Sequence, residues 1–545
     1  MSTTRYFERT QIGPKLPAIS RLRTIVETPF YGNNVVEIQS LQQAYDLAVH
    51  SPGTIVTDMK IEQPEHLGLR SDSRVLLFND GAVTGRAAAA RRIVGQENVN
   101  TEALDKRVMD AVYDTRWSKL YHAQVVVGLD SEFMVRAHLL IPEGEENLLY
   151  DWMLNFQPIT PEVEKRLAAS KRYAEEGDIY VFSSPQWSHA EHPMGLTYFD
   201  PQHNCCALLG MRYFGEHKKG TLTLAWAIAN RNGFACCHGG SKKMTPPQGD
   251  PYVLAVFGLS GSGKSTITHA RHGGRFATQI LHDDAFVIHT EKKFTIALEP
   301  TYFDKTQDYP ADSPDNKYLL TVQNCGATRD AEGQLICVTE DIRNGNGRAI
   351  KSRLWSPNRV DRINERINSI AWIMKDPVLP PLMRVDDPVL ASLMGATLST
   401  KRTSAERLGE GIDPSALVIE PYANPFRTYP LGDDFTKFAA LFRDGVCCYL
   451  LNTGDFLNQK VPKELTLEVL ERCATNKITW KPFADWNGFY YAELPGFDVP
   501  FDEPSYREAL ARSVQVRYDF LCSRGAYDAL PEEAKNAFAQ LLTLS

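Results

Sequence analysis

The sequence predicts a mixed α/β fold divided into two or three domains, and three observations lead to this prediction. The chain has 545 residues, more than a single hydrophobic core ordinarily organises. Strand-like apolar runs and segments of helical periodicity occur on both sides of residue 240. The clearest candidate domain boundary, called the seam below, is the stretch 239–250, which is rich in Gly and Pro. We therefore expect one domain over 1–240 and a second over 241–545.

Local patterns predict the individual elements. Before the seam, 74–78, 123–129 and 133–140 resemble strands, and 101–113 has helical periodicity. After it, we expect helices over 359–371 and 463–473, a buried strand over 446–451 and a largely helical region over 505–542.

Composition limits the class of protein. Hydrophobic residues make up 43% and charged residues 23%, an ordinary globular balance. The net charge of -8 argues against a general nucleic-acid binder. No run of 18 apolar residues and no signal-peptide pattern occurs, so we expect no membrane partner. The ten cysteines contain no C-x-x-C spacing, which favours reduced thiols and a cytoplasmic location.

The most informative motif follows the apolar run 253–257. It reads Gly258-Leu259-Ser260-Gly261-Ser262-Gly263-Lys264-Ser265-Thr266, a G-x-x-x-x-G-K-S loop opening a short helix. The glycines let backbone N–H groups point at phosphate oxygens, Lys264 reaches the outer phosphates, and the Ser265 hydroxyl can bind Mg²⁺. A plain Gly/Ser turn would not call for a lysine at that position. We therefore predict a nucleoside triphosphate site.

Two adjacent carboxylates come soon after the loop. Asp283 and Asp284 end a second short strand that covers 279–282. At a strand end they can hold Mg²⁺ or Mn²⁺, opposite Ser265. The alternative is a solvated turn, but the loop just upstream favours the metal site.

A further set of polar residues lies before the seam. Tyr213, Lys218 and Lys219 precede His238, which ends a strand-like run over 233–237. Taken alone, the lysines fit a solvated surface and the histidine a structural role. A histidine, a lysine that loses its proton and an aspartate can also form a Mn²⁺ site. A separate cluster, His189, Glu191, His192 and His203, suggests another metal site, although an exposed polar loop is the preferred interpretation.

In their order and spacing, these motifs resemble the ATP-dependent phosphoenolpyruvate carboxykinase family. The resemblance rests on 213–220, His238, the loop and the aspartate pair, and its specific parts are the interval from Lys219 to His238 and the loop sequence Gly-Leu-Ser-Gly-x-Gly-Lys. Elsewhere in the chain, 83–86 with Arg86, 346–348 with Arg348, 379–381 and 451–454 also resemble segments of this family. Lys460 and Thr466 extend the similarity to the C-terminal half, and they are expected, with Glu299, to contact the nucleotide.

The resemblance implies a two-domain carboxykinase fold with an active cleft between the domains and the phosphate loop in the C-terminal domain. It implies that oxaloacetate and ATP give phosphoenolpyruvate, ADP and carbon dioxide. In that reaction Lys219, His238 and Asp284 would hold Mn²⁺ at the enolate oxygen. Ser265 and Asp283 would hold the Mg²⁺ of ATP.

The same resemblance assigns roles to the remaining residues. Arg86 and Arg348 would grip carboxylate and phosphoryl oxygens, and Tyr213 would orient the departing carboxylate. Ser260 would position the substrate, and Lys218 and Lys264 would balance the charge on the transferring group. The partner is then oxaloacetate or a related small acid, and a monomer is favoured.

Departures from the family pattern leave two alternatives open. The interval between Lys264 and Asp283 is a few residues longer, Lys460 replaces an arginine, and Asp455 replaces a tryptophan. Lys292 or Lys293 would have to substitute for a phosphate-facing lysine. The alternatives are a phosphate-loop kinase acting on another small acid or a protein hydroxyl, and a nucleotide-binding regulator.

Overall fold

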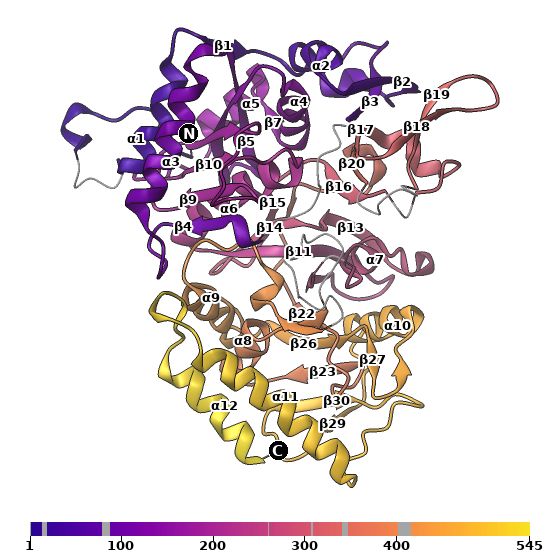
Figure 1. Cartoon of the computed structure of the whole chain (residues 1–545). Coiled ribbons are helices and arrows are strands. Elements are labelled where there is room, and N and C mark those ends of the chain that lie inside the picture. The colour runs from indigo at the N-terminus through magenta and orange to yellow at the C-terminus, as the bar shows by residue number, and fades with distance from the viewer. Residues whose placement is uncertain are drawn as a thin grey trace. The chain divides into compact units, whose positions relative to one another are not determined.

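A computed structural model describes residues 2–544 except 14–18, 79–87, 260, 307–308, 341–346 and 402–415. It has the expected mixed α/β architecture with several sheets (Figure 1). The chain divides into two compact units. The first contains the described residues up to Ile228 together with 298–357, and the second contains 229–297 and the described residues from 358 onward. These units differ from the expected ranges at 229–240 and 298–357, and the domain division at residue 240 stays a prediction.

The first unit is built on an eight-stranded sheet with the order β1-β5-β6-β8-β10-β9-β4, in which β7 also pairs with β5. Its strands are β1 (Val35–Ile38), β4 (Arg91–Ile93), β5 (Leu120–Asp130), β6 (Phe133–Pro142), β7 (Gln157–Pro158), β8 (Ile179–Ser184), β9 (Leu196–Asp200) and β10 (Cys205–Leu209). Every residue of β6 is buried, which is typical of a strand covered on both faces.

A five-stranded sheet completes this unit. It has the order β16-β20-β17-β3-β2. Its strands are β2 (Thr54–Lys60), β3 (Arg74–Phe78), β16 (Tyr302–Lys305), β17 (Leu319–Gln323) and β20 (Arg348–Lys351), and a hairpin joins β18 (Gly326–Arg329) to β19 (Leu335–Val338). The helices are α1 (Arg21–Glu27), α2 (Leu41–His50), α3 (Thr101–Asp114), α4 (Glu146–Asn155), α5 (Pro161–Ala169) and α6 (Phe214–Arg231), which continues into the second unit.

The second unit contains an eleven-stranded sheet with the order β21-β15-β14-β11-β12-β22-β26-β23-β30-β29, and β13 pairs with β11. Its strands are β11 (Phe234–Thr245), β12 (Tyr252–Phe257), β13 (Ala277–His282), β14 (Ala285–His289), β15 (Thr295–Ala297), β21 (Arg362–Ile363), β22 (Ser369–Met374), β23 (Leu382–Val385), β26 (Cys447–Asn452), β29 (Trp480–Pro482) and β30 (Phe489–Ala492). The central strands β12, β22 and β26 run parallel, so their carboxyl ends meet at one edge, and the phosphate loop leaves β12 there.

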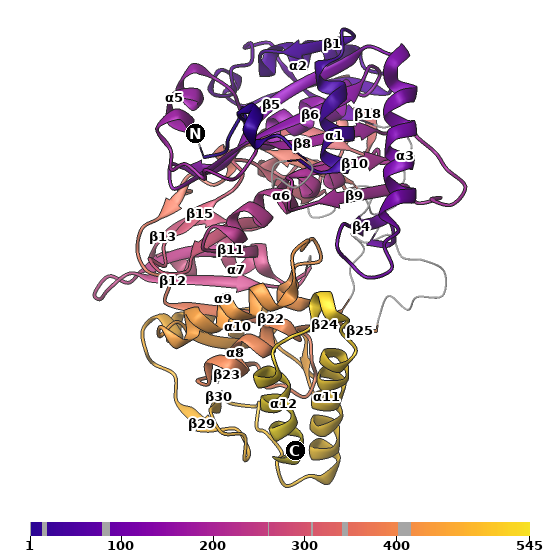
Figure 2. The same ribbon diagram turned by 90° about the vertical axis from the view of Figure 1, so that its left-hand side faces the viewer.

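Helices and short hairpins complete the second unit. They are α7 (Lys264–His269), α8 (Pro388–Ala396), α9 (Leu431–Arg443), α10 (Lys463–Ala474), α11 (Pro504–Cys522), α12 (Glu532–Leu544), the pair β24 (Ser399–Lys401) and β25 (Leu417–Ile419), and the pair β27 (Asp455–Phe456) and β28 (Gln459–Lys460). The long helices α11 and α12 lie side by side, as Figure 2 shows.

Most of the expected elements are confirmed, but the helix expected over 359–371 is wrong. That segment contains β21 and the start of β22, which pairs with β12 on one side and β26 on the other. All six residues of β22 are buried. The apolar residues Val360, Ile363, Ile367 and Ile370 are three or four positions apart, a spacing typical of a helix, but pairing with neighbouring strands overrides this local pattern. Among the described residues, no helix is long and apolar enough to cross a membrane.

Candidate functional site

The phosphate loop has the backbone that its glycines predict. Gly261 and Gly263 have φ values of +77° and +102°, a region that side chains disfavour. A Cβ on Gly258 would lie 2.3 Å from the Ser262 Oγ. The Thr453 hydroxyl donates to the Ser262 carbonyl at 2.9 Å, which fixes the loop from the end of β26. Ser260 lies outside the described residues.

Three predicted residues meet beside this loop. Lys264 begins α7, His238 lies on β11, and Asp284 lies between β13 and β14. The His238 Nε2 is 3.4 Å from the Lys264 Nζ and 3.1 Å from the Asp284 Oδ1. Because β11 pairs with β12 and also with β13 and β14, the sheet itself brings these residues together.

A backbone carbonyl fixes the orientation of the His238 ring. The His238 Nδ1–H donates to the Ala423 carbonyl, which can only accept. In the neutral ring the lone pair therefore lies on Nε2 and faces the Asp284 carboxylate. Two electron-rich atoms at this separation are stabilised by a shared proton or by a cation, and imidazole and carboxylate are ligands that Mn²⁺ accepts. His238 and Asp284 thus fit the predicted metal.

Asp283 has a different environment. Its side chain is buried, and its Oδ2 lies 3.4 Å from the His269 Nε2. Burial by itself would raise the pKa of Asp283, but the hydrogen bond from His269, the nearby histidine charges and the Ser265 hydroxyl together hold this pKa below its ordinary value. The carboxylate is therefore ionised at neutral pH and suited to a divalent cation shared with Ser265.

In the first unit, Lys218 and Glu299 form a fully buried ion pair. The Lys218 Nζ lies 3.0 Å from the Glu299 Oε1, and both side chains have 0% exposure. The Asn155 side chain donates to the other Glu299 oxygen at 2.7 Å. Glu299, predicted as a nucleotide contact, is therefore the counterion of Lys218 here, and the nucleotide contact stays a prediction.

Tyr213 and Lys219 lie on either side of Lys218 in the sequence. A Cβ on Gly215 would lie 2.3 Å from the Tyr213 Cε1, so the glycine is what lets the Tyr213 ring lie against the start of α6. Lys219 is buried, with its Nζ 5.8 Å from the centre of the Trp226 ring. Its participation in a metal site with His238 and Asp284 stays a prediction.

The two predicted arginines differ in what the structure describes. Arg348 begins β20, between β16 and β17; it is buried, and its Nη1 donates to the Gly347 carbonyl at 2.8 Å. Arg86 lies outside the described residues.

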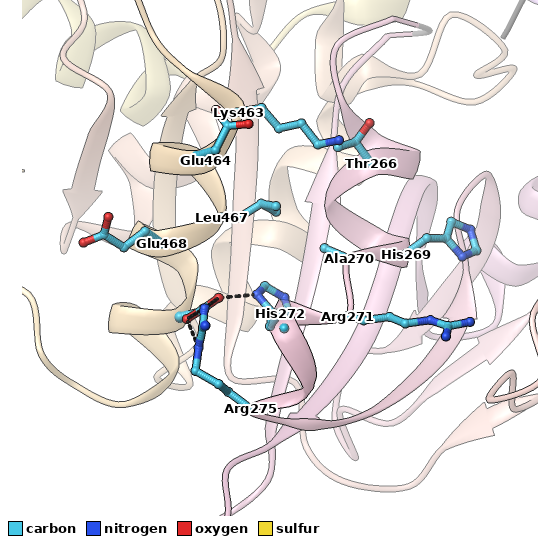
Figure 3. Close-up of a pocket in the computed structure, with 12 residues that line it drawn as sticks. Thr266, His269, Ala270, Arg271, His272, Arg275, Lys463, Glu464, Leu467 and Glu468 are labelled. Carbon is cyan, nitrogen blue, oxygen red and sulfur yellow. Dashed lines mark hydrogen bonds and ion pairs between the residues drawn. The ribbon is translucent and has the colours of Figure 1, made fainter.

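The C-terminal nucleotide candidates lie on and before α10. Lys460 is exposed on β28, whereas Thr466 is buried within α10 and its hydroxyl donates to the Pro462 carbonyl at 3.3 Å. A cavity of about 700 Å³ lies between α7 and α10. In Figure 3 the Lys463 side chain extends across it toward Thr266, the last residue of the loop motif.

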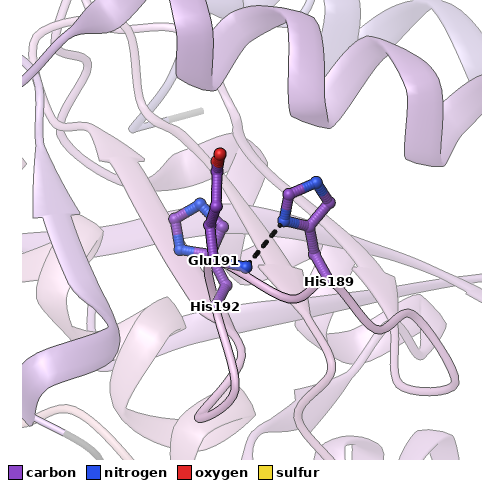
Figure 4. Close-up of side chains that lie close together, drawn as sticks. All are labelled: His189, Glu191 and His192. Atoms are coloured by element: carbon purple, nitrogen blue, oxygen red, sulfur yellow. Dashed lines mark hydrogen bonds between the residues drawn. The ribbon is translucent and has the colours of Figure 1, made fainter.

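The histidine cluster of the first unit is only partly assembled. Ligand atoms of His189, Glu191 and His192 lie within 4.8 Å of one another (Figure 4), and His203 instead pairs with Asp200. The His189 Nδ1 accepts the Glu191 backbone N–H at 3.1 Å, and Arg107 pairs with the Glu191 carboxylate at 3.0 Å. These contacts fit the preferred interpretation of a polar loop.

Sequence reasoning missed the partners that hold the predicted residues. They are the Ala423 carbonyl for His238, His269 for Asp283, and Glu299 as the counterion of Lys218. Ala423 is 185 positions from His238, and no local pattern marks it.

Comparisons with known proteins agree with the resemblance. The family model for phosphoenolpyruvate carboxykinase matches residues 55–487. The chain is 26% identical over 498 residues to a phosphoenolpyruvate carboxykinase (ATP) of Aeropyrum pernix, covering 86% of this chain and 94% of that protein. It is 26% identical over 246 residues to a glycosomal phosphoenolpyruvate carboxykinase (ATP) of Trypanosoma cruzi, covering 41% and 48%. A phosphoenolpyruvate carboxykinase (ATP) of Dictyostelium discoideum is 24% identical over 240 residues, 40% of each chain. Because the family model spans most of the sequence, the chain belongs to the phosphoenolpyruvate carboxykinase family.

Proposed function

We propose that this protein converts oxaloacetate and ATP into phosphoenolpyruvate, ADP and carbon dioxide. The observation that carries the proposal is the meeting of His238, Asp284 and Lys264 beside the phosphate loop, in a chain that belongs to this family. A kinase that needs only a phosphate loop has no evident use for a histidine turned by a backbone carbonyl toward a carboxylate.

The reaction needs two kinds of stabilisation. Loss of carbon dioxide leaves an enolate, whose oxygen then attacks the γ-phosphorus in line with the departing ADP. Bound Mn²⁺ and Mg²⁺ would supply Lewis-acid stabilisation of the enolate oxygen and of the phosphates. His238, Asp284 and Lys219 are the proposed ligands of the first ion, and Ser265 and Asp283 those of the second.

The chain's own residues would supply orientation and charge. Lys264, at the start of α7, would donate toward the outer phosphates. Lys218, held by Glu299, would place a second cation near the transferring group. Arg86 and Arg348 would bind the acid through paired hydrogen bonds, Tyr213 would orient the carboxylate that leaves, and Ser260 would position the substrate.

Further features belong to the same proposal. They are a two-domain carboxykinase fold with the loop in the C-terminal domain, nucleotide contacts from Glu299, Lys460 and Thr466, Mn²⁺ as the preferred ion, a monomeric state and a cytoplasmic location. The family match and the ten free thiols support them.

The decisive assay supplies purified protein with ATP, Mn²⁺ and oxaloacetate and follows phosphoenolpyruvate. A paired titration of ATP and oxalate, an analogue of the acid, then compares wild type with Arg86→Gln. We expect the variant to bind oxalate more weakly by about 1.5–3 kcal/mol while ATP affinity barely changes, because a charge-assisted hydrogen bond is lost. If wild type forms no phosphoenolpyruvate and does not bind oxalate, the oxaloacetate assignment fails and a kinase or regulator takes its place.

A further inference from the structure

A lysine outside the proposed site is buried in the second unit. Lys242 lies on β11 with 1% exposure. Its Nζ is 2.6 Å from the Ile267 carbonyl, 3.5 Å from the Ala270 carbonyl and 2.6 Å from the His272 Nε2. An ammonium has three N–H donors, and these three acceptors match them.

The contacts continue from Lys242 to α10. The His272 Nδ1 lies 2.9 Å from the Glu471 Oε1, and Arg275 donates to both Glu471 oxygens at 2.7 Å. Figure 3 shows these links between the 270–275 segment and α10. Lys242, His272, Glu471 and Arg275 form a continuous network, which we call the brace.

The brace touches two of the elements that carry proposed nucleotide contacts, α7 and α10. Ile267 and Ala270 are at the carboxyl end of α7, the helix that Lys264 opens, and Ala270 is its C-cap. Glu471 is on α10, the helix that contains Thr466. His272 and Arg275 lie within the interval between Lys264 and Asp283, where the sequence is longer than the family pattern.

The electrostatics fix the direction of the hydrogen bonds. Burial lowers the pKa of Lys242 to about 7, against the opposing charge of Glu471. Burial and the Lys242 charge lower the pKa of His272. His272 is therefore neutral at pH 7, with Nε2 accepting from Lys242 and Nδ1–H donating to Glu471. Above its pKa Lys242 loses one donor, so one of its three acceptors loses its partner.

We propose that Lys242, acting through His272 and Glu471, is a positioning residue that links the carboxyl end of α7 to α10 across the floor of the cavity between them and thereby aims Lys264 and the phosphate loop at the nucleotide. This inference rests on the proposed function only in taking ATP as the nucleotide. The Gly240 backbone also packs closely on α7, where a Cβ would lie 1.9 Å from the Thr268 Oγ1, so β11 contacts the carboxyl-terminal half of this helix at two positions.

The test compares Lys242→Met with Lys243→Met. Lys243 is the next residue on the strand, and its Nζ pairs with Glu365 at 2.6 Å instead of contacting α7. We expect Lys242→Met to raise both the Kd and the KM for ATP by about 10-fold, by analogy with the lower end of the range found when side chains that orient metal ligands are replaced. The KM for oxaloacetate and kcat should change much less, and Lys243→Met should behave like wild type.

A second variant covers the case in which Lys242→Met does not fold. Glu471→Gln keeps a hydrogen-bond acceptor for His272 on a partly exposed side chain but removes the charge, so we expect a smaller loss of ATP affinity. Measuring the ATP affinity of wild type and Lys242→Met over a pH series adds a further test, because a purely structural role of Lys242 predicts that their difference does not change with pH. Wild type should bind ATP more tightly than Lys242→Met at low pH. This difference in ATP affinity should decline as pH rises through about 7, the pKa of Lys242, because Lys242 then loses its proton. The charged or titratable groups facing it through the network are His272, Glu471 and Arg275.

The outcomes separate the two proposals. If wild type binds ATP and the Lys242 and Glu471 variants bind it equally well, the brace has no positioning role. If wild type binds ATP but forms no phosphoenolpyruvate, the proposed function fails, and the ATP titrations still decide the brace. If wild type binds no ATP, both the proposed function and the positioning role of the brace are excluded.

Discussion

Glu299→Gln is the most informative perturbation of stability, because it leaves the shape of a buried ion pair and removes one charge. Lys218 and Glu299 have no exposed side-chain surface, and the Asn155 amide supports the carboxylate. Glutamine presents an NH₂ or a neutral oxygen to the ammonium instead of a carboxylate. The Lys218 charge then stays buried without its counterion.

The magnitude follows from the separation of the charges. At 3.0 Å and an effective dielectric constant of about 20, the Coulomb attraction is about 5.5 kcal/mol. Breaking one partner of a buried pair ordinarily costs about 3–5 kcal/mol, because the remaining charge is desolvated and uncompensated. We therefore expect Glu299→Gln to lower the free energy of unfolding by about 3–5 kcal/mol.

Urea denaturation measures this loss, with Glu493→Gln as the control. Glu493 pairs with Lys481 at 2.5 Å, but both side chains are about half exposed, so we expect little change. The double variant Lys218→Met with Glu299→Leu should recover most of the lost stability, since apolar side chains can replace a buried pair. A loss below about 1 kcal/mol for Glu299→Gln would refute the reasoning. Weaker ATP binding by a folded Glu299→Gln protein would instead support the predicted nucleotide contact.

Three further predictions concern the second unit. Lys264→Ala should lower turnover by about 100-fold or more with little loss of fold, measured by phosphoenolpyruvate formation, and wild-type turnover would overturn the loop assignment. His238→Ala and Asp284→Asn should each raise the Mn²⁺ concentration needed for half-maximal activity, since each removes a proposed ligand; an unchanged requirement in both would exclude them as ligands. Burial raises the pKa of Asp434 to about 7, although the charges of Arg427 and Lys437 oppose this shift. Between about pH 4 and pH 7 the Asp434 carboxyl is therefore protonated in the folded protein but ionised in the unfolded chain. Stability from this group is full at low pH and declines as pH rises to about 7. Asp434→Asn should remove a slope of at most about 1.4 kcal/mol per pH unit between pH 5 and 7, and parallel stability curves for both proteins would contradict the assignment.

The sequence alone was sufficient where the chemistry is local. The phosphate loop needs positive φ at Gly261 and Gly263 and a lysine at the first position of the helix, and all of these conditions fall within nine consecutive residues. The strand that ends before Asp283 and the helix over 463–473 were predictable for the same reason. Local hydrogen bonds and side-chain periodicity set their conformation.

Only the tertiary structure decided the features that depend on distant partners. The segment 369–374 is a strand because β12 and β26 satisfy its backbone on both sides, and its apolar sequence fits a helix equally well. The His238 lone pair points at Asp284 because a carbonyl 185 positions away holds the opposite nitrogen. Lys242 and Lys243 are indistinguishable as neighbours in the sequence, yet one is buried against α7 and the other pairs with Glu365. Alternation along β11 turns them to opposite faces, and what lies on each face is set by the packing of the whole sheet.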